Sequence, residues 1–115
     1  DFNDLVQKDI CLIGHSASTI ENMLTMLQKV EEGDLNTNRS VAAVGSLSAA
    51  KDGLQALIDA TYPGKVVIFP NIRELPLTPV VELGKVLPEV SEKLADGRTW
   101  TKEAEREFLA QMAQE

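Results

Sequence analysis

The chain has 115 residues, of which 43% are hydrophobic and 25% charged, a composition typical of one small globular domain or of a piece of a larger one. Its 18 acidic and 11 basic residues give a formal net charge of -7. This charge argues against binding to nucleic acid or to an anionic membrane surface, because both need a basic face. No apolar run is long enough to cross a bilayer and the polar start does not resemble a signal peptide, so we expect a cytoplasmic protein.

The first predicted elements are a strand at residues 10–13 and a helix that follows it. The strand is a continuous apolar run closed by Gly14, as in a parallel sheet buried on both faces. Ser18 and Glu21 have the spacing of a capping box and predict the start of the helix. Gly33 is placed to end it. Apolar residues follow at helical spacing between these ends: Ile20, Met23, Leu24, Leu27 and Val30.

A second strand, helix and strand follow. Residues 41–44 form a short apolar run, and Ser48 is a candidate cap for a helix that carries Leu54, Leu57 and Ile58 and stops at residues 62–64. Residues 65–69 are rich in β-branched side chains and predict the strongest strand. The alternation predicts an α/β fold, with the strands at 10–13 and 65–69 in the interior of a sheet.

Beyond Pro70, prolines divide the chain into shorter elements. Residues 73–79 are predicted as an extended connector, and residues 80–94 as a helix that Pro88 kinks or divides. Asp96 and Gly97 predict a turn, and Thr101 a cap for the last helix. We expect this tail to pack on a partner surface through Trp100, Phe108, Leu109 and Met112.

The residues themselves offer few candidate sites. The loop at residues 14–18 joins a strand to a helix N-terminus, a common place for binding anions, but it lacks the G-x-G-x-x-G fingerprint and an ordinary turn would have the same pattern. His15 is a ligand, a proton donor or a polar loop residue, and Lys65 either faces a phosphate or is an exposed strand residue. Cys11 is the single cysteine, which excludes an internal disulfide and a thiolate zinc cluster.

Four stretches in sequence order carry a family resemblance: residues 9–14, 20–36, 41–50 and 64–69. Together they resemble the later part of the zinc-type medium-chain dehydrogenases, which include alcohol, threonine and polyol dehydrogenases. Residues 75–79 and 97–101 are similar to a subgroup that includes sorbose-1-phosphate reductases. The resemblance implies an α/β fragment of a Rossmann-type cofactor domain, with the return to the catalytic domain and a C-terminal helical extension.

The resemblance divides the chain into three segments. Residues 1–35 are the last strand and helix of the cofactor-binding domain, 36–79 the return segment and final strand, and 80–115 the extension. The backbone of Ile13 and Gly14 is expected near the nicotinamide, and Lys65 near the phosphates of the cofactor. His15 and Ser16 belong to the same loop but stand where relatives often have small residues.

The function implied by the resemblance is that of an NAD(P)-dependent oxidoreductase of which this chain is the C-terminal portion. The parent protein would bind NAD or NADP and a small alcohol, polyol or sugar phosphate, and would hold zinc through ligands outside this chain. No catalytic residue or metal ligand is assigned here, so the isolated chain is expected to be inactive and to self-associate. Two alternatives remain: an autonomous, non-enzymatic α/β protein-interaction module that binds through the helix at 100–112, and a phosphate sensor that uses the loop at 14–18.

Overall fold

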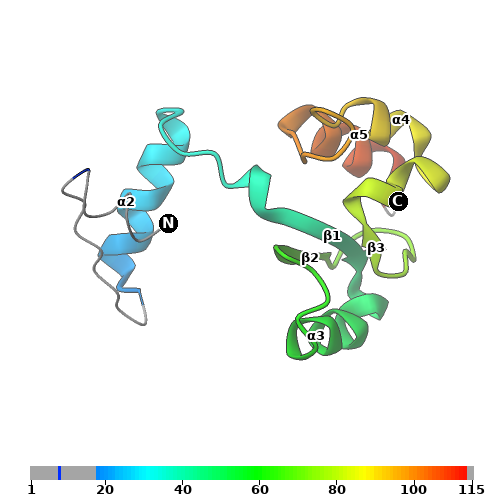
Figure 1. The fold of residues 1–115 in the computed structure, drawn as a ribbon. Helices are drawn as coiled ribbons and strands as arrows, with labels where there is room; N and C mark the ends of the chain where they lie inside the picture. Colours follow the sequence, from blue (N-terminus) through cyan, green and yellow to red (C-terminus); the bar gives the residue numbers. More distant parts are fainter. Residues whose placement is uncertain (1–7, 9–17, 114–115) are drawn as a thin grey trace. The chain divides into compact units, whose positions relative to one another are not determined.

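The computed structural model describes Lys8 and residues 18–113, which belong to two compact units, Asp1–Leu35 and Asn36–Glu115 (Figure 1). The strand predicted at residues 10–13, with Cys11, lies outside the described residues. The predicted segments 36–79 and 80–115 both lie in the second unit.

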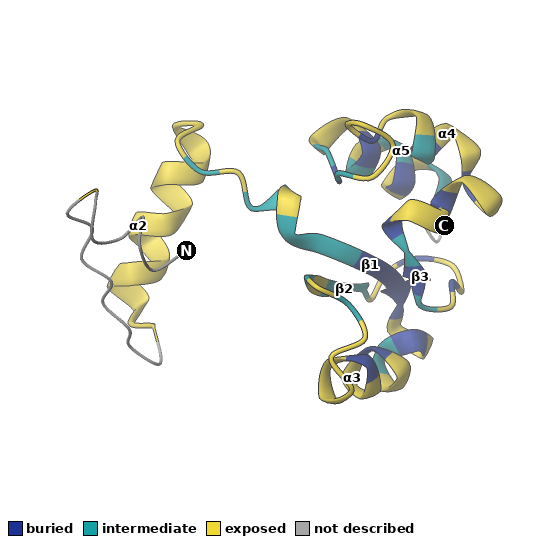
Figure 2. Ribbon diagram, in the orientation of Figure 1, coloured by how far each residue is buried: buried dark blue, intermediate teal, exposed yellow. Residues whose placement is uncertain are grey.

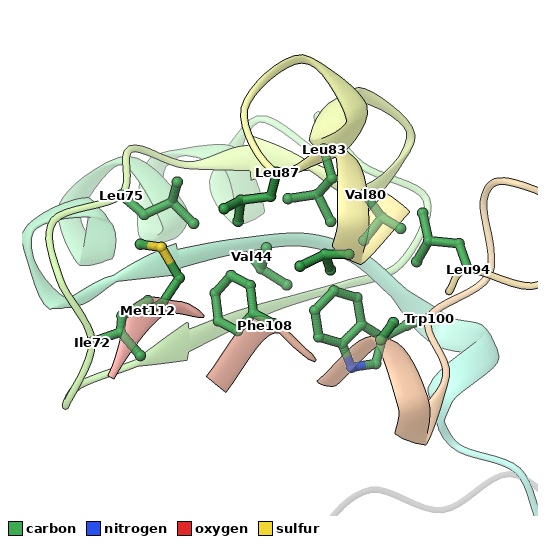
Figure 3. Packing of buried hydrophobic residues seen from close by; sticks show 12 residues of the cluster. Val44, Ile72, Leu75, Val80, Leu83, Leu87, Leu94, Trp100, Phe108 and Met112 are labelled. Carbon is green, nitrogen blue, oxygen red and sulfur yellow. The ribbon is translucent and has the colours of Figure 1, made fainter. Parts of the chain in front are cut away.

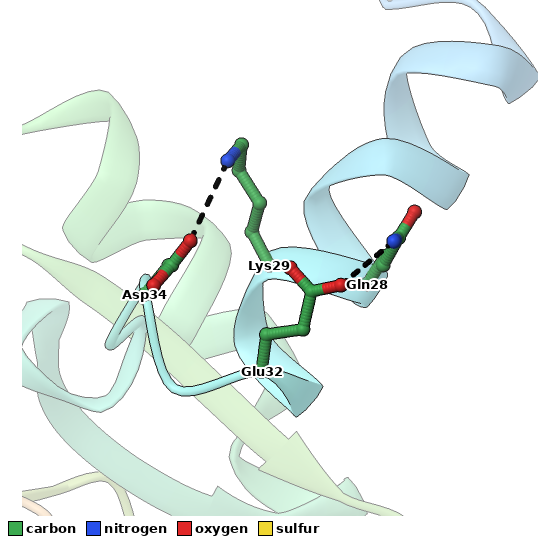
Figure 4. Close-up of polar contacts among 4 residues, drawn as sticks. All are labelled: Gln28, Lys29, Glu32 and Asp34. Atoms are coloured by element: carbon green, nitrogen blue, oxygen red, sulfur yellow. Dashed lines mark hydrogen bonds and ion pairs between the residues drawn. The ribbon is translucent and has the colours of Figure 1, made fainter.

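In the first unit, helix α2 spans Ile20–Glu31. Its cap is Thr19 and not Ser18 as predicted, because the extended backbone of Thr19 directs its hydroxyl oxygen to accept from the amide of Asn22 at 3.2 Å. Gly33 follows the helix with φ +83°, as predicted for its C-terminal end. Around this end, Lys29 pairs with Asp34 at 3.7 Å and Gln28 donates to Glu32 at 2.7 Å (Figure 4).

The apolar stripe of α2 is not buried. Figure 2 shows the helix exposed along its whole length, and no residue of α2 is buried. Leu24 is 62% exposed and Leu27 55%. The periodicity predicted the helix, but among the described residues of this unit no second apolar surface covers its apolar face.

The second unit is built on a small mixed sheet, so the fold is α/β. A short 3-10 turn, η1 (Asn38–Ser40), leads into strand β1 (Val41–Ser46). The 3-10 turn η2 (Leu47–Ala49) and helix α3 (Ala50–Ile58) connect it to β2 (Lys65–Phe69), which pairs parallel with β1. Helix α3 is therefore the crossover between neighbouring parallel strands.

Helix α3 differs from the prediction in its cap and in its buried face. Residue Ala49 precedes the helix without a side-chain cap, and Ser48 instead lies in η2. Gly53 and Ala56 are the buried residues of α3, and a Cβ on Gly53 would lie 3.1 Å from Val66 Cγ1. The small residues thus let α3 approach β2 closely, while the larger apolar residues predicted for this helix are exposed: Leu54, Leu57 and Ile58.

The prediction of an extended connector at 73–79 is partly wrong, because the last two residues of this segment form a strand of the sheet. Strand β3 (Thr78–Pro79) pairs antiparallel with β1, giving the strand order β2-β1-β3. Pro79 suits this position because an edge strand needs fewer backbone donors. In the described sheet, β2 therefore lies at an end and not in the interior as predicted, with half-buried side chains after an exposed Lys65.

The remaining elements follow the sequence prediction closely. Pro88 divides the predicted helix into η3 (Val80–Lys85), a 3-10 helix, and α4 (Pro88–Glu92), where it occupies the first turn. Asp96 and Gly97 form the predicted turn with φ +54° and +67°. Helix α5 spans Lys102–Met112, and Thr101 caps it by accepting from the amide of Ala104 at 3.0 Å.

The face of α5 predicted to bind a partner packs inside this unit. Trp100, Phe108 and Met112 join a buried apolar cluster with Val44 of β1 (Figure 3). The ring centroids of Phe108 and Phe69 are 4.9 Å apart. The prediction that these residues contact a partner is therefore wrong, because the sheet and η3 already cover them. Leu109 is not part of this cluster and stays 41% exposed.

Candidate functional site

Of the five predicted site residues, the structure describes one. Ile13, Gly14, His15 and Ser16 lie outside the described residues. Lys65 is the first residue of β2 and is exposed. Within the described ranges it forms no salt bridge, so its ammonium group is available to a ligand.

The backbone before Lys65 is held close to the start of β1. A Cβ on Gly64 would collide with the carbonyl oxygen of Ser40 and lie 3.1 Å from the Cβ of Ala42. Only glycine fits this approach without a shift of the neighbouring chain. Gly64 therefore fixes the position at which Lys65 enters the sheet, beside its register partner Val41.

The carboxyl ends of β1 and β2 border a pocket of about 400 Å³ lined partly by Ser46, Ser48 and Glu74. Ligands of open α/β sheets commonly bind at this edge. The Ser46 hydroxyl is engaged by the backbone, since its oxygen accepts from the amide of Leu75 at 3.0 Å and lies 3.0 Å from the carbonyl oxygen of Leu75. It also lies 2.9 Å from the Ser48 hydroxyl. A nucleophilic serine needs a neighbouring base, and the described residues that line this pocket include no His or Lys.

The amino ends of the same strands border a second pocket, of about 420 Å³. Arg39, Tyr62 and Arg98 line it together with Gly64. Lys65 follows Gly64 directly but is not among the lining residues. The sequence prediction missed both arginines as site residues, because they are far apart in the chain. Arg98 lies in the stretch 97–101 that resembles the dehydrogenase subgroup, but the resemblance assigns it no role.

In the part of the chain that the structure describes, no three or more His, Cys, Asp or Glu residues are grouped so that they could hold a metal ion. None of the described helices combines the length and the apolar character needed to cross a membrane.

Comparison with protein-family models, with curated proteins and with solved structures gives no match for this chain. The dehydrogenase resemblance therefore depends on the residue patterns given above and remains a prediction.

Proposed function

We propose that this chain is the C-terminal portion of an NAD(P)-dependent zinc-type oxidoreductase that acts on an alcohol, polyol or sugar phosphate. The observation that carries the proposal is the parallel unit β1-α3-β2 with Lys65 exposed at the first residue of β2. The resemblance assigns these elements to the return segment and the final strand. It assigns Lys65 to the phosphates of the cofactor, and the lysine has no counterion in the described chain that would compete for it.

The exposed apolar faces of α2 and α3 support a role as part of a larger protein. Side chains of this size are normally covered in a soluble protein, and contiguous exposed apolar patches mark contact surfaces. In the proposed parent, the helix α2 would cover the sheet of the cofactor domain. This accounts for a helix that has an amphipathic sequence and no buried residue.

Within the proposed parent this chain would bind and position the cofactor. A zinc ion held by residues outside this chain would supply polarisation of the alcohol oxygen, and the bound cofactor would supply hydride transfer. Lys65 would neutralise phosphate charge, and the backbone of Ile13 and Gly14 would contact the nicotinamide. The isolated chain would therefore show no turnover.

The second candidate is a non-enzymatic protein-interaction module. The buried face of α5 no longer supports it, but the exposed stripe of α2 would serve the same purpose. The sequence encoded upstream discriminates between the two candidates. A G-x-G-x-x-G pattern after a strand and a Cys and His zinc pattern would support the dehydrogenase, whereas their absence would favour the module.

Substitution of Lys65 in the parent protein tests its assigned role. We expect Lys65→Ala to weaken cofactor binding by about 1–3 kcal/mol, the range for loss of a charge-assisted hydrogen bond, and to change substrate affinity far less. Fluorescence titration of the cofactor at two salt concentrations measures this, since a phosphate contact weakens as salt rises. Lys51→Ala, at an exposed lysine of α3, is the matched control. Equal cofactor dissociation constants for wild type and Lys65→Ala would remove Lys65 from the site.

A further inference from the structure

The pocket at the amino ends of β1 and β2 combines apolar walls with two guanidinium groups. Its walls include Val41, Ala42, Pro79 and Val81. Arg39 lines it from η1, and Arg98 from the segment that follows the 96–97 turn. A volume of about 420 Å³ lies within the usual range for small-molecule sites. A pocket of this kind suits a ligand with an apolar body and a polar end.

The charges of the pocket favour an anion. The acidic residue in its lining, Glu82, is paired with Lys85 at 2.9 Å. Among the residues placed by the structure, Arg39 and Arg98 have no salt-bridge partner. The pocket therefore carries an excess of positive charge, in a chain whose formal net charge is -7.

Two further pockets among the described residues of this unit lack that excess. The pocket at the carboxyl ends of the strands has Glu74 as its charged residue, and a pocket beside the 96–97 turn contains both Arg39 and Asp96. In the first of these pockets an anionic ligand would be repelled by Glu74. In the second, the negative charge of Asp96 would offset the positive charge of Arg39. The distribution of charge thus singles out the pocket lined by both arginines.

We infer that this pocket binds a small organic anion, with the apolar body of the ligand against Val41 and Val81 and its anionic group between Arg39 and Arg98. Arginine suits this role because its planar guanidinium donates two parallel hydrogen bonds to a phosphate or carboxylate. The inference is independent of the dehydrogenase proposal, since Lys65 does not line the pocket.

Amide NMR spectra of the 115-residue chain, titrated with phenyl phosphate, test the inference. We expect saturable shifts at residues 40–42 and at Tyr62 and Gly64, with a dissociation constant of about 1 mM for so small a probe. Phenol, which is neutral and has the same ring, should shift these amides far less. Arg39→Gln and Arg98→Gln should each raise the dissociation constant about tenfold, since each removes a charge-assisted contact.

Arg106→Gln is the matched control, because Arg106 is an exposed residue of α5 outside the pocket. It removes the same charge and should leave the dissociation constant unchanged. Arg98→Lys retains the charge and should bind phenyl phosphate more tightly than Arg98→Gln does. This comparison separates an effect of the lost charge from an effect of altered structure. The inference fails if phenyl phosphate leaves these amides unshifted, if phenol shifts them equally, or if both glutamine variants bind as Arg106→Gln does.

Discussion

At the residue scale, Ser46 secures the segment that leads from the sheet to the C-terminal helices. Its amide donates to the carbonyl oxygen of Leu75 at 3.0 Å, and its hydroxyl oxygen accepts from the amide of Leu75 at the same distance. Both residues are buried. The amide of Leu75 therefore depends on one side-chain hydroxyl for its hydrogen bond.

Removal of the Ser46 hydroxyl should destabilise the second unit. We expect Ser46→Ala to lower the free energy of unfolding by about 1–3 kcal/mol, because a buried amide loses its acceptor. Ser48→Ala is the matched control, since Ser48 is exposed and its side chain bonds, within the described residues, to the Ser46 hydroxyl and not to the backbone. Urea unfolding followed by circular dichroism measures both variants, and equal stabilities would contradict the assigned role of Ser46.

At the scale of the element, α5 shows how two adjacent apolar residues can have opposite surroundings. Phe108 is 0% exposed and its ring centroid lies 5.6 Å from that of Trp100. Leu109 is one residue further along and 41% exposed. The helix therefore packs through one face into the buried cluster, next to α4 and with Phe108 against Phe69 of β2, and the exposed side contributes little to the core.

Alanine substitutions on α5 should reflect this difference. We expect Phe108→Ala to destabilise the second unit by about 3–5 kcal/mol, the range for a buried aromatic side chain, and Leu109→Ala by less than about 1 kcal/mol. Thermal unfolding of both variants measures the difference. If Phe108→Ala abolishes the folded state, Phe108→Leu provides the milder comparison with Leu109→Ala. Similar losses at the two positions would show that α5 does not pack as described.

At the scale of the whole molecule, the apolar faces of α2 and α3 remain exposed, each within its own unit. Exposed apolar surface promotes association in water. The end strand β2 adds to this, because in the described sheet it pairs only with β1 and has a second edge that can accept another strand. We therefore expect the chain to self-associate.

Charge substitutions on one helix test this expectation. We expect Leu24→Glu with Leu27→Glu on α2 to reduce the average mass in sedimentation experiments, because the two carboxylates would have to be buried on association. Thr25→Glu with Gln28→Glu adds the same charge to α2 at exposed polar positions and is the control. A compact monomer of wild type at high concentration, with no binding of a hydrophobic dye, would overturn the prediction and favour an autonomous module.

The sequence by itself determined the features that depend on a few neighbouring residues. It predicted β2, the end of α2 at Gly33, the turn at residues 96–97, a kink or division at Pro88 and the cap at Thr101. Each follows from local backbone preferences and short hydrogen bonds. At the candidate site, the same local reasoning correctly placed Lys65 at the start of a strand, although it did not predict the position of that strand at the end of the described sheet.

Only the tertiary structure decided which apolar surfaces are covered and which distant residues meet. The sequences of α2 and α5 both have apolar residues at helical spacing, yet α5 is partly buried and α2 is not. Periodicity states which residues share a face, whereas burial requires a second surface that other parts of the chain must supply. The pairing of β3 with β1 and the meeting of Arg39 with Arg98 at one pocket have the same cause, since both depend on contacts between segments far apart in the sequence.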